Sequence, residues 1–199
     1  MSIWATNSSF VDSCTWEAVI AVRSWARDRP RSPNLDPELF LITGIPGSGK
    51  TTYGNEFARM FGFAHYDLEN QQTLNRLAAN PMQFIDNNAQ SGGKAVVTWG
   101  FLPDQSQISI VEQFKSSGFK LIWLDGNRQA ALDRFDARAK TKSSSKAEYY
   151  RRMHEFYLQM YRIETSKVIE TITPVITNPF DAQGQFKSAE ELLQELRRS

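Results

Sequence analysis

The chain has 199 residues, a formal net charge of +1, 41% hydrophobic residues and 23% charged residues. This composition is typical of a globular domain with a sizeable core, and the near-neutral charge excludes a general electrostatic attraction to nucleic acid or to membrane surfaces. The sequence has no apolar run near the roughly 20 residues that span a membrane. Asp12 and Glu17 interrupt the segment where a secretory signal would lie, and the single Cys14 has no disulfide partner in the chain. We therefore expect one main domain in the cytoplasm.

Residues 1–38 are predicted to form an N-terminal helical extension and linker. Apolar residues recur at helical spacing between Phe10 and Arg27, and three prolines then interrupt regular structure before residue 38. We expect the apolar stripe of this helix to pack on the core. A contact surface for a second subunit is the alternative, so we expect a monomer or a homodimer.

A phosphate-binding loop follows the first predicted strand, Leu39–Thr43. Residues 44–51 read G-I-P-G-S-G-K-T, which matches G-x-x-x-x-G-K-[ST], and a helix is predicted from Thr52 to Phe61. Glycines let main-chain N–H groups surround a phosphate, and the helix N-terminus adds partial positive charge. Lys50 is predicted to reach the β- and γ-phosphates, and the Thr51 hydroxyl to bind Mg²⁺. The predicted nucleotide-binding residues of this loop are Gly44, Ile45, Pro46, Gly47, Ser48, Gly49, Lys50, Thr51 and Thr52.

Two carboxylates follow the second predicted strand, Phe63–Tyr66. The carboxyl ends of parallel strands face the ligand, so we expect Asp67 near the γ-phosphate, where it can accept the proton of an acceptor hydroxyl. Glu69 can bind another hydroxyl of the acceptor. The structural alternative for Asp67 is the N-cap of a helix over Leu68–Ala79. His65 is expected to be a packed or surface histidine.

The third predicted strand, Lys94–Thr98, ends without an acidic residue. Many phosphate-loop proteins place there an Asp that holds Mg²⁺, so Thr98 argues against a GTPase switch or a motor ATPase. Gly100 offers a main-chain N–H that can approach the acceptor closely. Asp125, after the fourth predicted strand Phe119–Leu124, is expected to be a turn residue rather than a metal ligand.

A basic segment comes next. Between Arg128 and Arg152 the chain has eight Lys or Arg and three acidic residues, a local net charge of +5. Arg134 and Arg138 are four residues apart and share one helix face. We predict a closing lid over about residues 134–152, whose arginines neutralise the charge of the γ-phosphoryl group. A solvated helix is the alternative.

The pattern from residue 39 to residue 199 predicts one α/β domain. Apolar strands alternate with helical segments, which favours a parallel sheet with helices on both faces, a three-layer sandwich. The last predicted strand, Ile172–Thr177, contains Pro174 and is expected at an edge of the sheet. A helix over Ser188–Arg198 closes the chain.

These motifs resemble the small P-loop kinases, which include shikimate and gluconate kinases, chloramphenicol phosphotransferase, polynucleotide kinase and the zeta-toxin group. The likeness covers about residues 39–198. The resemblance implies a five-stranded sheet in the order 2-3-1-4-5, ATP with Mg²⁺, transfer to a hydroxyl, and Asn178 near the adenine. The residues that carry it are Gly44–Thr51, Asp67-Leu68-Glu69, Thr98-Trp99-Gly100, Arg134 and Arg138. Three departures argue against shikimate as the acceptor: Glu69 in place of Asp, Phe101 in place of Gly, and the N-terminal extension.

The sequence therefore predicts an ATP-dependent kinase that phosphorylates a hydroxyl of a small molecule or nucleoside. In this reading Lys50, Asp67, Arg134 and Arg138 carry the chemistry, and Asp67, Glu69 and Gly100 bind the acceptor. One alternative has a nucleic-acid hydroxyl as the acceptor, with the basic segment following phosphates. A second alternative is a regulatory nucleotide-binding protein with residual ATPase activity.

Overall fold

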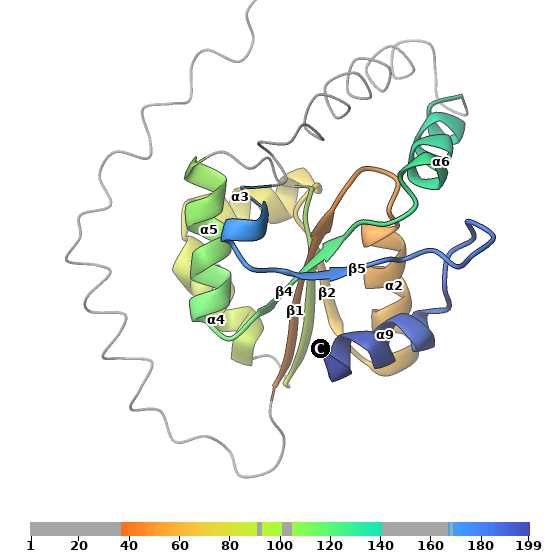
Figure 1. Ribbon diagram of the computed structural model, residues 1–199. Helices are drawn as coiled ribbons and strands as arrows, with labels where there is room; N and C mark the ends of the chain where they lie inside the picture. The colour runs from red at the N-terminus through yellow and green to blue at the C-terminus, as the bar shows by residue number, and fades with distance from the viewer. Residues whose placement is uncertain (1–36, 91–92, 101–104, 141–166, 168) are drawn as a thin grey trace, which may run out of the picture. The chain divides into compact units, whose positions relative to one another are not determined.

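A computed structural model describes residues 37–90, 93–100, 105–140, 167 and 169–199 (Figure 1). The predicted helix between Phe10 and Arg27 lies outside the described residues, as do residues 141–152 of the predicted lid. The domain boundary predicted at residue 38 therefore stays a prediction.

The five strands form one sheet in the order β2-β3-β1-β4-β5, and all neighbouring strands run parallel, as predicted. β5 lies at one edge and begins only at Val175, after Pro174, which has no N–H for a sheet ladder. The predicted start at Ile172 is wrong, because Ile172 lies in a turn after the helical residues 169–171, where the N–H of Thr173 donates to the carbonyl of Glu170 at 3.0 Å. The strands are β1 Glu38–Gly44, β2 Ala64–Asp67, β3 Lys94–Thr98, β4 Lys120–Leu124 and β5 Val175–Thr177.

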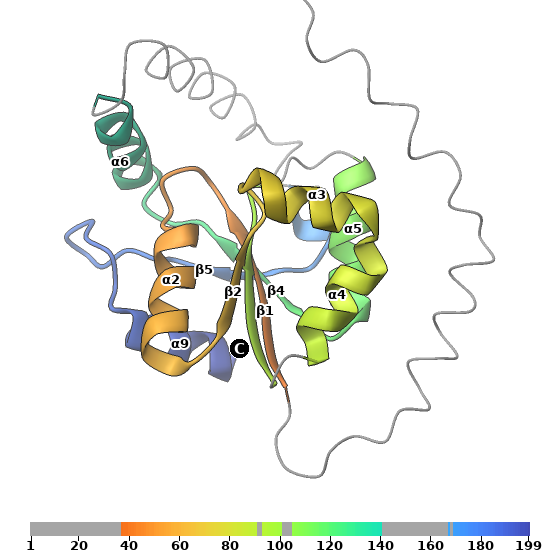
Figure 2. The same cartoon turned by 180° about the vertical axis from the view of Figure 1, so that it is seen from behind.

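Helices cover both faces of the sheet (Figures 1 and 2). Side chains alternate along β1: Phe40 and Ile42 pack toward α2 and α9, whereas Leu39 and Leu41 pack toward α3, α4 and α5. The two buried clusters make the three-layer sandwich predicted from the strand–helix alternation. The helices are α2 Lys50–Phe61, α3 Gln71–Ala79, α4 Pro81–Gln90, α5 Gln105–Ser116, α6 Arg128–Lys140 and α9 Ala189–Arg198.

Local capping sets where several helices begin and end. Gly62 ends α2 in the left-handed conformation with φ 74°, and Ser188 starts α9 with a capping box to Glu191. The predicted start of the helix over Leu68–Ala79 is wrong. It begins at Gln71, because the Asn70 side chain accepts hydrogen bonds from the N–H groups of residues 72 and 73. Asp67 is therefore not the N-cap of this helix.

Candidate nucleotide and acceptor site

The phosphate loop connects β1 to α2 at the carboxyl edge of the sheet. Gly44, Gly47 and Gly49 all have positive φ angles, of 134°, 78° and 89°. A Cβ atom on Gly44 would collide with the main chain of Leu124, and one on Gly47 with the carbonyl of Ala131. The loop geometry therefore requires glycine, as the sequence motif predicted.

The Lys50 side chain is enclosed by this loop. Its Nζ donates to the carbonyl oxygens of Gly44 and Ile45, each at 3.2 Å, and the residue is 7% exposed. Burial lowers the pKa of the Lys50 ammonium, and the charge of Arg138 lowers it further. The charges of Glu69 and, more weakly, Asp67 act in the opposite direction. A buried cation of this kind gains stability when an anion binds beside it.

Ser48 supplies a second feature that fits a phosphate. Its residue exposure is 0%, and its Oγ has no hydrogen-bond partner among the residues that the structure describes. A buried hydroxyl without a hydrogen-bond partner costs free energy. A bound phosphate would offset this cost if one of its oxygens accepted a hydrogen bond from the hydroxyl. With the three glycines and the Lys50 ammonium, this hydroxyl makes the loop chemically suited to a polyphosphate.

Thr51 and Asp67 meet on the side of the loop next to β2. The Thr51 hydroxyl donates to Asp67 Oδ2 at 3.2 Å, and Asp67 Oδ1 accepts from the main-chain N–H of Glu69 at 3.0 Å. Mg²⁺ in kinase sites is bound by one or two protein oxygens together with phosphate oxygens and water, so this pair fits Mg²⁺. Within the described part of the chain, no group of three or more His, Cys, Asp or Glu is placed to hold a metal.

Glu69 lies beside Gly100 and close to Lys50. A Cβ atom on Gly100 would stand 2.7 Å from Glu69 Oε1 and 3.8 Å from the Cε of Lys50. The absent side chain of Gly100 therefore leaves room for the Glu69 carboxylate next to the buried cation. The two carboxylates after β2 diverge, with Asp67 toward Thr51 and Glu69 toward Gly100.

His65 fixes the strand that ends in Asp67. Its Nδ1 lies 2.9 Å from Asn55 Oδ1 in α2, and its Nε2 lies 2.9 Å from Thr98 Oγ1 in β3. The ring packs on Gly54, where a Cβ would collide with it. Burial lowers the pKa of the His65 imidazole, and the charge of Asp67 opposes this. His65 is packed, one of the two alternatives expected from the sequence.

Arg134 lies against an aromatic cluster formed after β5. Its guanidinium carbon is 4.1 Å from the centroid of the Phe186 ring, and its Nη2 donates to Gln185 Oε1 at 3.0 Å. Phe186 stacks on Phe180 with ring centroids 5.1 Å apart. The Tyr53 hydroxyl, whose pKa is raised by burial, donates at 2.8 Å to the carbonyl of the residue before Phe180, which ties the cluster to α2.

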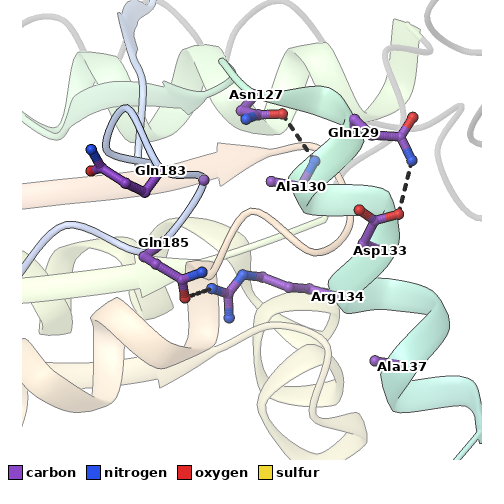
Figure 3. Close-up of a pocket in the computed structure, with 9 residues that line it drawn as sticks. Asn127, Gln129, Ala130, Asp133, Arg134, Ala137, Gln183 and Gln185 are labelled. Atoms are coloured by element: carbon purple, nitrogen blue, oxygen red, sulfur yellow. Dashed lines mark hydrogen bonds between the residues drawn. The ribbon is translucent and has the colours of Figure 1, made fainter.

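A cavity of about 480 Å³ opens between the start of α6 and the hairpin that follows β5 (Figure 3). The two elements that form it each contact the phosphate loop. Gly47 abuts Ala131 in α6, and a Cβ on Gly49 would stand 2.9 Å from the Phe186 ring in the hairpin. The residues that line the cavity are Asn127, Gln129, Ala130, Asp133, Arg134, Ala137, Gln183, Gly184 and Gln185.

The two predicted lid arginines thus have different surroundings. Arg134 lines the cavity, whereas Arg138, one helical turn further along α6, is exposed and acts electrostatically on Lys50. Asn178 is not among the cavity-lining residues. Its Oδ1 accepts from the N–H of Phe180 at 3.0 Å, and its side chain packs on Gly126.

Asp125 forms an ion pair with Arg128 at 2.6 Å and lies in the turn before α6, as expected of a turn residue. Sequence reasoning missed Gln183, Gln185 and Phe186 as site residues. The signal available for them was the polar turn Gln183-Gly184-Gln185 soon after the last strand.

Comparison with known proteins extends the fold assignment. No protein-family model matches the sequence, and no curated protein matches it either. The structure is similar to a shikimate kinase from Bacteroides thetaiotaomicron, with a TM-score of 0.50 and 19% identity over 81% of this chain and 99% of that chain. A gluconokinase from Sinorhizobium meliloti 1021 gives a TM-score of 0.46 and 15% identity over 83% of this chain and 98% of that chain.

The structural neighbours are thus small P-loop kinases, as the sequence resemblance implied, and the fold is the one that these kinases share. Among the described residues, no helix is both long enough and apolar enough to cross a membrane.

Proposed function

We propose that this chain is an ATP- and Mg²⁺-dependent kinase that transfers the γ-phosphoryl group to a hydroxyl of a small molecule or nucleoside. The divergence of the two carboxylates after β2 carries the proposal. Asp67 accepts a hydrogen bond from Thr51, whereas Glu69 lies beside Gly100 and Lys50. Transfer to a hydroxyl requires charge neutralisation on the phosphate side and a carboxylate on the acceptor side, and this pair can supply both.

On the phosphate side, Lys50 and the N–H groups of the loop hold the β- and γ-phosphates. Thr51 and Asp67 would hold Mg²⁺, which when bound neutralises charge on the phosphate oxygens. The Asp67 carboxylate already accepts bonds from Thr51 and from the N–H of Glu69. We therefore assign Asp67 to the metal rather than to the acceptor proton.

On the acceptor side, Glu69 takes the proton of the acceptor hydroxyl. The hydroxyl oxygen forms a bond to the γ-phosphorus while the bond from that phosphorus to the β–γ bridging oxygen breaks, and ADP leaves with the electron pair. The proton passes to the Glu69 carboxylate. Gly100 keeps this carboxylate within reach of the phosphate loop, since a larger residue would displace it.

The two arginines of α6 act at different points. Arg138, whose charge reaches Lys50, is proposed to neutralise the moving phosphoryl group. Arg134 faces the cavity beside the aromatic cluster and is proposed to contact the nucleotide base. Closure of a lid over residues 134–152 belongs to the same proposal, as does the nucleotide-binding role of Asn178.

The proposal is tested by following labelled γ-phosphate from ATP with Mg²⁺ to a panel of sugars, nucleosides, oligonucleotides, and aminocyclitol and phenicol antibiotics. The wild type should label one acceptor class, and a Lys50→Met variant should label none. Transfer to oligonucleotides that falls steeply with salt would make a nucleic acid the acceptor. Label found only as free phosphate would overturn the kinase proposal in favour of a regulatory nucleotide-binding protein.

A further inference from the structure

His65 connects three elements near the carboxyl edge of the sheet without taking part in the proposed phosphoryl transfer. His65 and Asp67 are two residues apart in β2, so both side chains lie on the face of the strand that meets α2. Thr51 and Asn55 are four residues apart in α2 and share one face of that helix. The two elements therefore meet through two pairs of side chains, Thr51 with Asp67 and Asn55 with His65.

The hydrogen bonds of His65 fix which ring nitrogen carries the proton. Nδ1 lies 2.9 Å from Asn55 Oδ1, and because an amide oxygen only accepts, Nδ1 carries the proton and donates. In the neutral ring Nε2 is then an acceptor, and the Thr98 hydroxyl donates to it at 2.9 Å. Both ring nitrogens thus have a partner, one in α2 and one in β3.

Gly54 provides the space for this ring. A Cβ atom at residue 54 would collide with Nε2 of His65, so alanine would displace the imidazole. Gly54 lies inside α2, where glycine destabilises a helix relative to alanine. The chain therefore has a helix-weakening residue at the turn of α2 that the ring touches, which favours a positioning role for His65 over simple packing.

The two bonds of His65 differ in what else holds the same elements together. β2 is already joined to β3 by the parallel ladder and by the N–H of Leu68, which donates to the carbonyl of Thr98 at 2.9 Å. The bond between His65 and Thr98 is therefore an addition to a main-chain junction. A helix satisfies its main-chain groups internally, so the separation of α2 from β2 is set by side chains.

Between α2 and β2, the contact made by Asn55 is the tighter of the two. The Thr51 hydroxyl is 3.2 Å from Asp67 Oδ2, longer than the roughly 2.5–3.0 Å of an ordinary O–H···O bond. The 2.9 Å between His65 Nδ1 and Asn55 Oδ1 is an ordinary N–H···O length. We propose that His65 is a positioning residue. Through its bond to Asn55, it keeps Asp67 at the distance from α2 that Mg²⁺ binding requires. This inference rests on the proposed function, in which Thr51 and Asp67 hold Mg²⁺.

Two variants that keep the imidazole test this role in the full chain. Asn55→Ala removes the bond to α2, and Thr98→Val removes the bond to β3. Outer-shell partners of metal ligands are worth roughly 10–100-fold in metal affinity, and we expect the lower end because His65 acts through the strand. Asn55→Ala should therefore raise the Mg²⁺ concentration for half-maximal binding of a fluorescent, non-hydrolysable ATP analogue about tenfold, and Thr98→Val by less than about twofold. A shift for Thr98→Val as large as that for Asn55→Ala, or no shift for Asn55→Ala, contradicts the proposal.

Substitution of His65 itself tests the same role by rescue. The amide nitrogen of asparagine stands where Nδ1 does, so His65→Asn keeps the bond to Asn55. The amide of glutamine reaches the position of Nε2, so His65→Gln keeps the bond to Thr98. Both variants lose the packing of the ring on Gly54 and should lose similar stability, but only His65→Gln should need about tenfold more Mg²⁺. Equal Mg²⁺ requirements for the two would show a merely structural role. Gly62→Ala, at the far end of α2, is the control for general loss of stability and should match the wild type.

The outcomes separate this inference from the proposed function. In ¹⁵N NMR spectra of the ligand-free chain, at a pH where the imidazole is neutral, the His65 proton should be on Nδ1, and a proton on Nε2 overturns the inference. The chain has two histidines, so the signals of His65 are assigned by their loss in His65→Gln. If the wild type does not bind the analogue, or binds it no better with Mg²⁺, the proposed function fails and the inference fails with it. Mg²⁺-dependent binding that no variant alters overturns the inference alone.

Discussion

The hydroxyl of Thr51 donates to the carboxylate of Asp67 at 3.2 Å, across the junction of α2 and β2. The two residues lie 16 positions apart in the chain, and the contact joins the end of the phosphate loop to the end of the second strand. The Asp67 carboxylate thus contacts Thr51, whereas the Glu69 carboxylate lies beside Gly100. The two carboxylates therefore have different surroundings, and we expect their substitution to have different effects.

The Asp67 carboxylate should govern the requirement for Mg²⁺. We expect Asp67→Asn to raise the Mg²⁺ concentration for half-maximal ATP binding by roughly 10–100-fold, as is usual when a group that orients or binds a metal is lost. Binding of ATP without Mg²⁺ should change little, because Lys50 and the loop remain. Titration of nucleotide binding against Mg²⁺ measures this. Asp86→Asn, in α4, is the matched control, and equal Mg²⁺ curves for the two variants would contradict the assignment.

Gly100 should matter for transfer and not for stability. Its φ angle is not in the left-handed region, so alanine fits the backbone, but the new Cβ would stand 2.7 Å from Glu69 Oε1. We expect Gly100→Ala to change the free energy of unfolding by less than about 0.5 kcal/mol while the rate of phosphoryl transfer falls at least tenfold. Denaturant titration measures the free energy of unfolding, and the transfer assay measures the rate.

Gly62 provides the opposite case as a control. It ends α2 with φ 74°, and a Cβ there would meet open space. Gly62→Ala should therefore cost roughly 1–2 kcal/mol of stability through backbone strain and leave the transfer rate of the folded enzyme unchanged. If Gly100→Ala transfers as fast as Gly62→Ala, the Glu69 side chain does not need the space that Gly100 leaves.

Lys50 should be needed for nucleotide binding but should not stabilise the ligand-free protein. Its ammonium is buried, and burial lowers its pKa despite the charge of Glu69 nearby. We expect Lys50→Met to leave the stability of the ligand-free protein equal or higher, because a buried charge is replaced by an apolar chain of similar length. Stabilisation of the protein by ATP in thermal melts should disappear. A variant that melts well below the wild type without nucleotide would contradict this account of Lys50.

His65 should make stability depend on pH below neutrality. Burial holds the pKa of the folded-state imidazole below its ordinary 6.5, so the unfolded chain binds a proton that the folded chain resists. The contribution of His65 is therefore present above pH 6.5 and is lost as pH falls from 6.5 toward the lower folded-state pKa. Denaturant titrations at several pH values should show a steeper loss for the wild type than for His65→Gln. Parallel curves would contradict this.

The strands and the phosphate loop could be predicted from the sequence because each depends on local composition, whereas the strand order was implied only by the resemblance to the small P-loop kinases. β1 and β4 are buried on both faces, so they appear as apolar runs, and the loop has a fixed glycine and lysine spacing. The end of α2 at Gly62 was predictable for the same reason, since the left-handed cap favours glycine.

The separate surroundings of Asp67 and Glu69 could not be predicted, because they depend on the turn after β2. Asp67 accepts the N–H of Glu69 there, and this bond directs one carboxylate toward Thr51. The cavity could not be predicted either, because it brings together Arg134 and Gln185, which are 51 residues apart. Spacing along the chain carries no information about contacts of that separation.

One comparison of variants tests most directly whether Glu69 is the acceptor base. Phosphoryl transfer to the acceptor identified in the panel is measured for the wild type, Glu69→Gln and Glu69→Asp, together with Mg²⁺-dependent ATP binding. We predict that Glu69→Gln loses roughly 10²–10⁴-fold in transfer rate with binding intact, and that Glu69→Asp recovers part of the loss. Transfer by Glu69→Gln at the wild-type rate would contradict the assignment of Glu69 as the acceptor base.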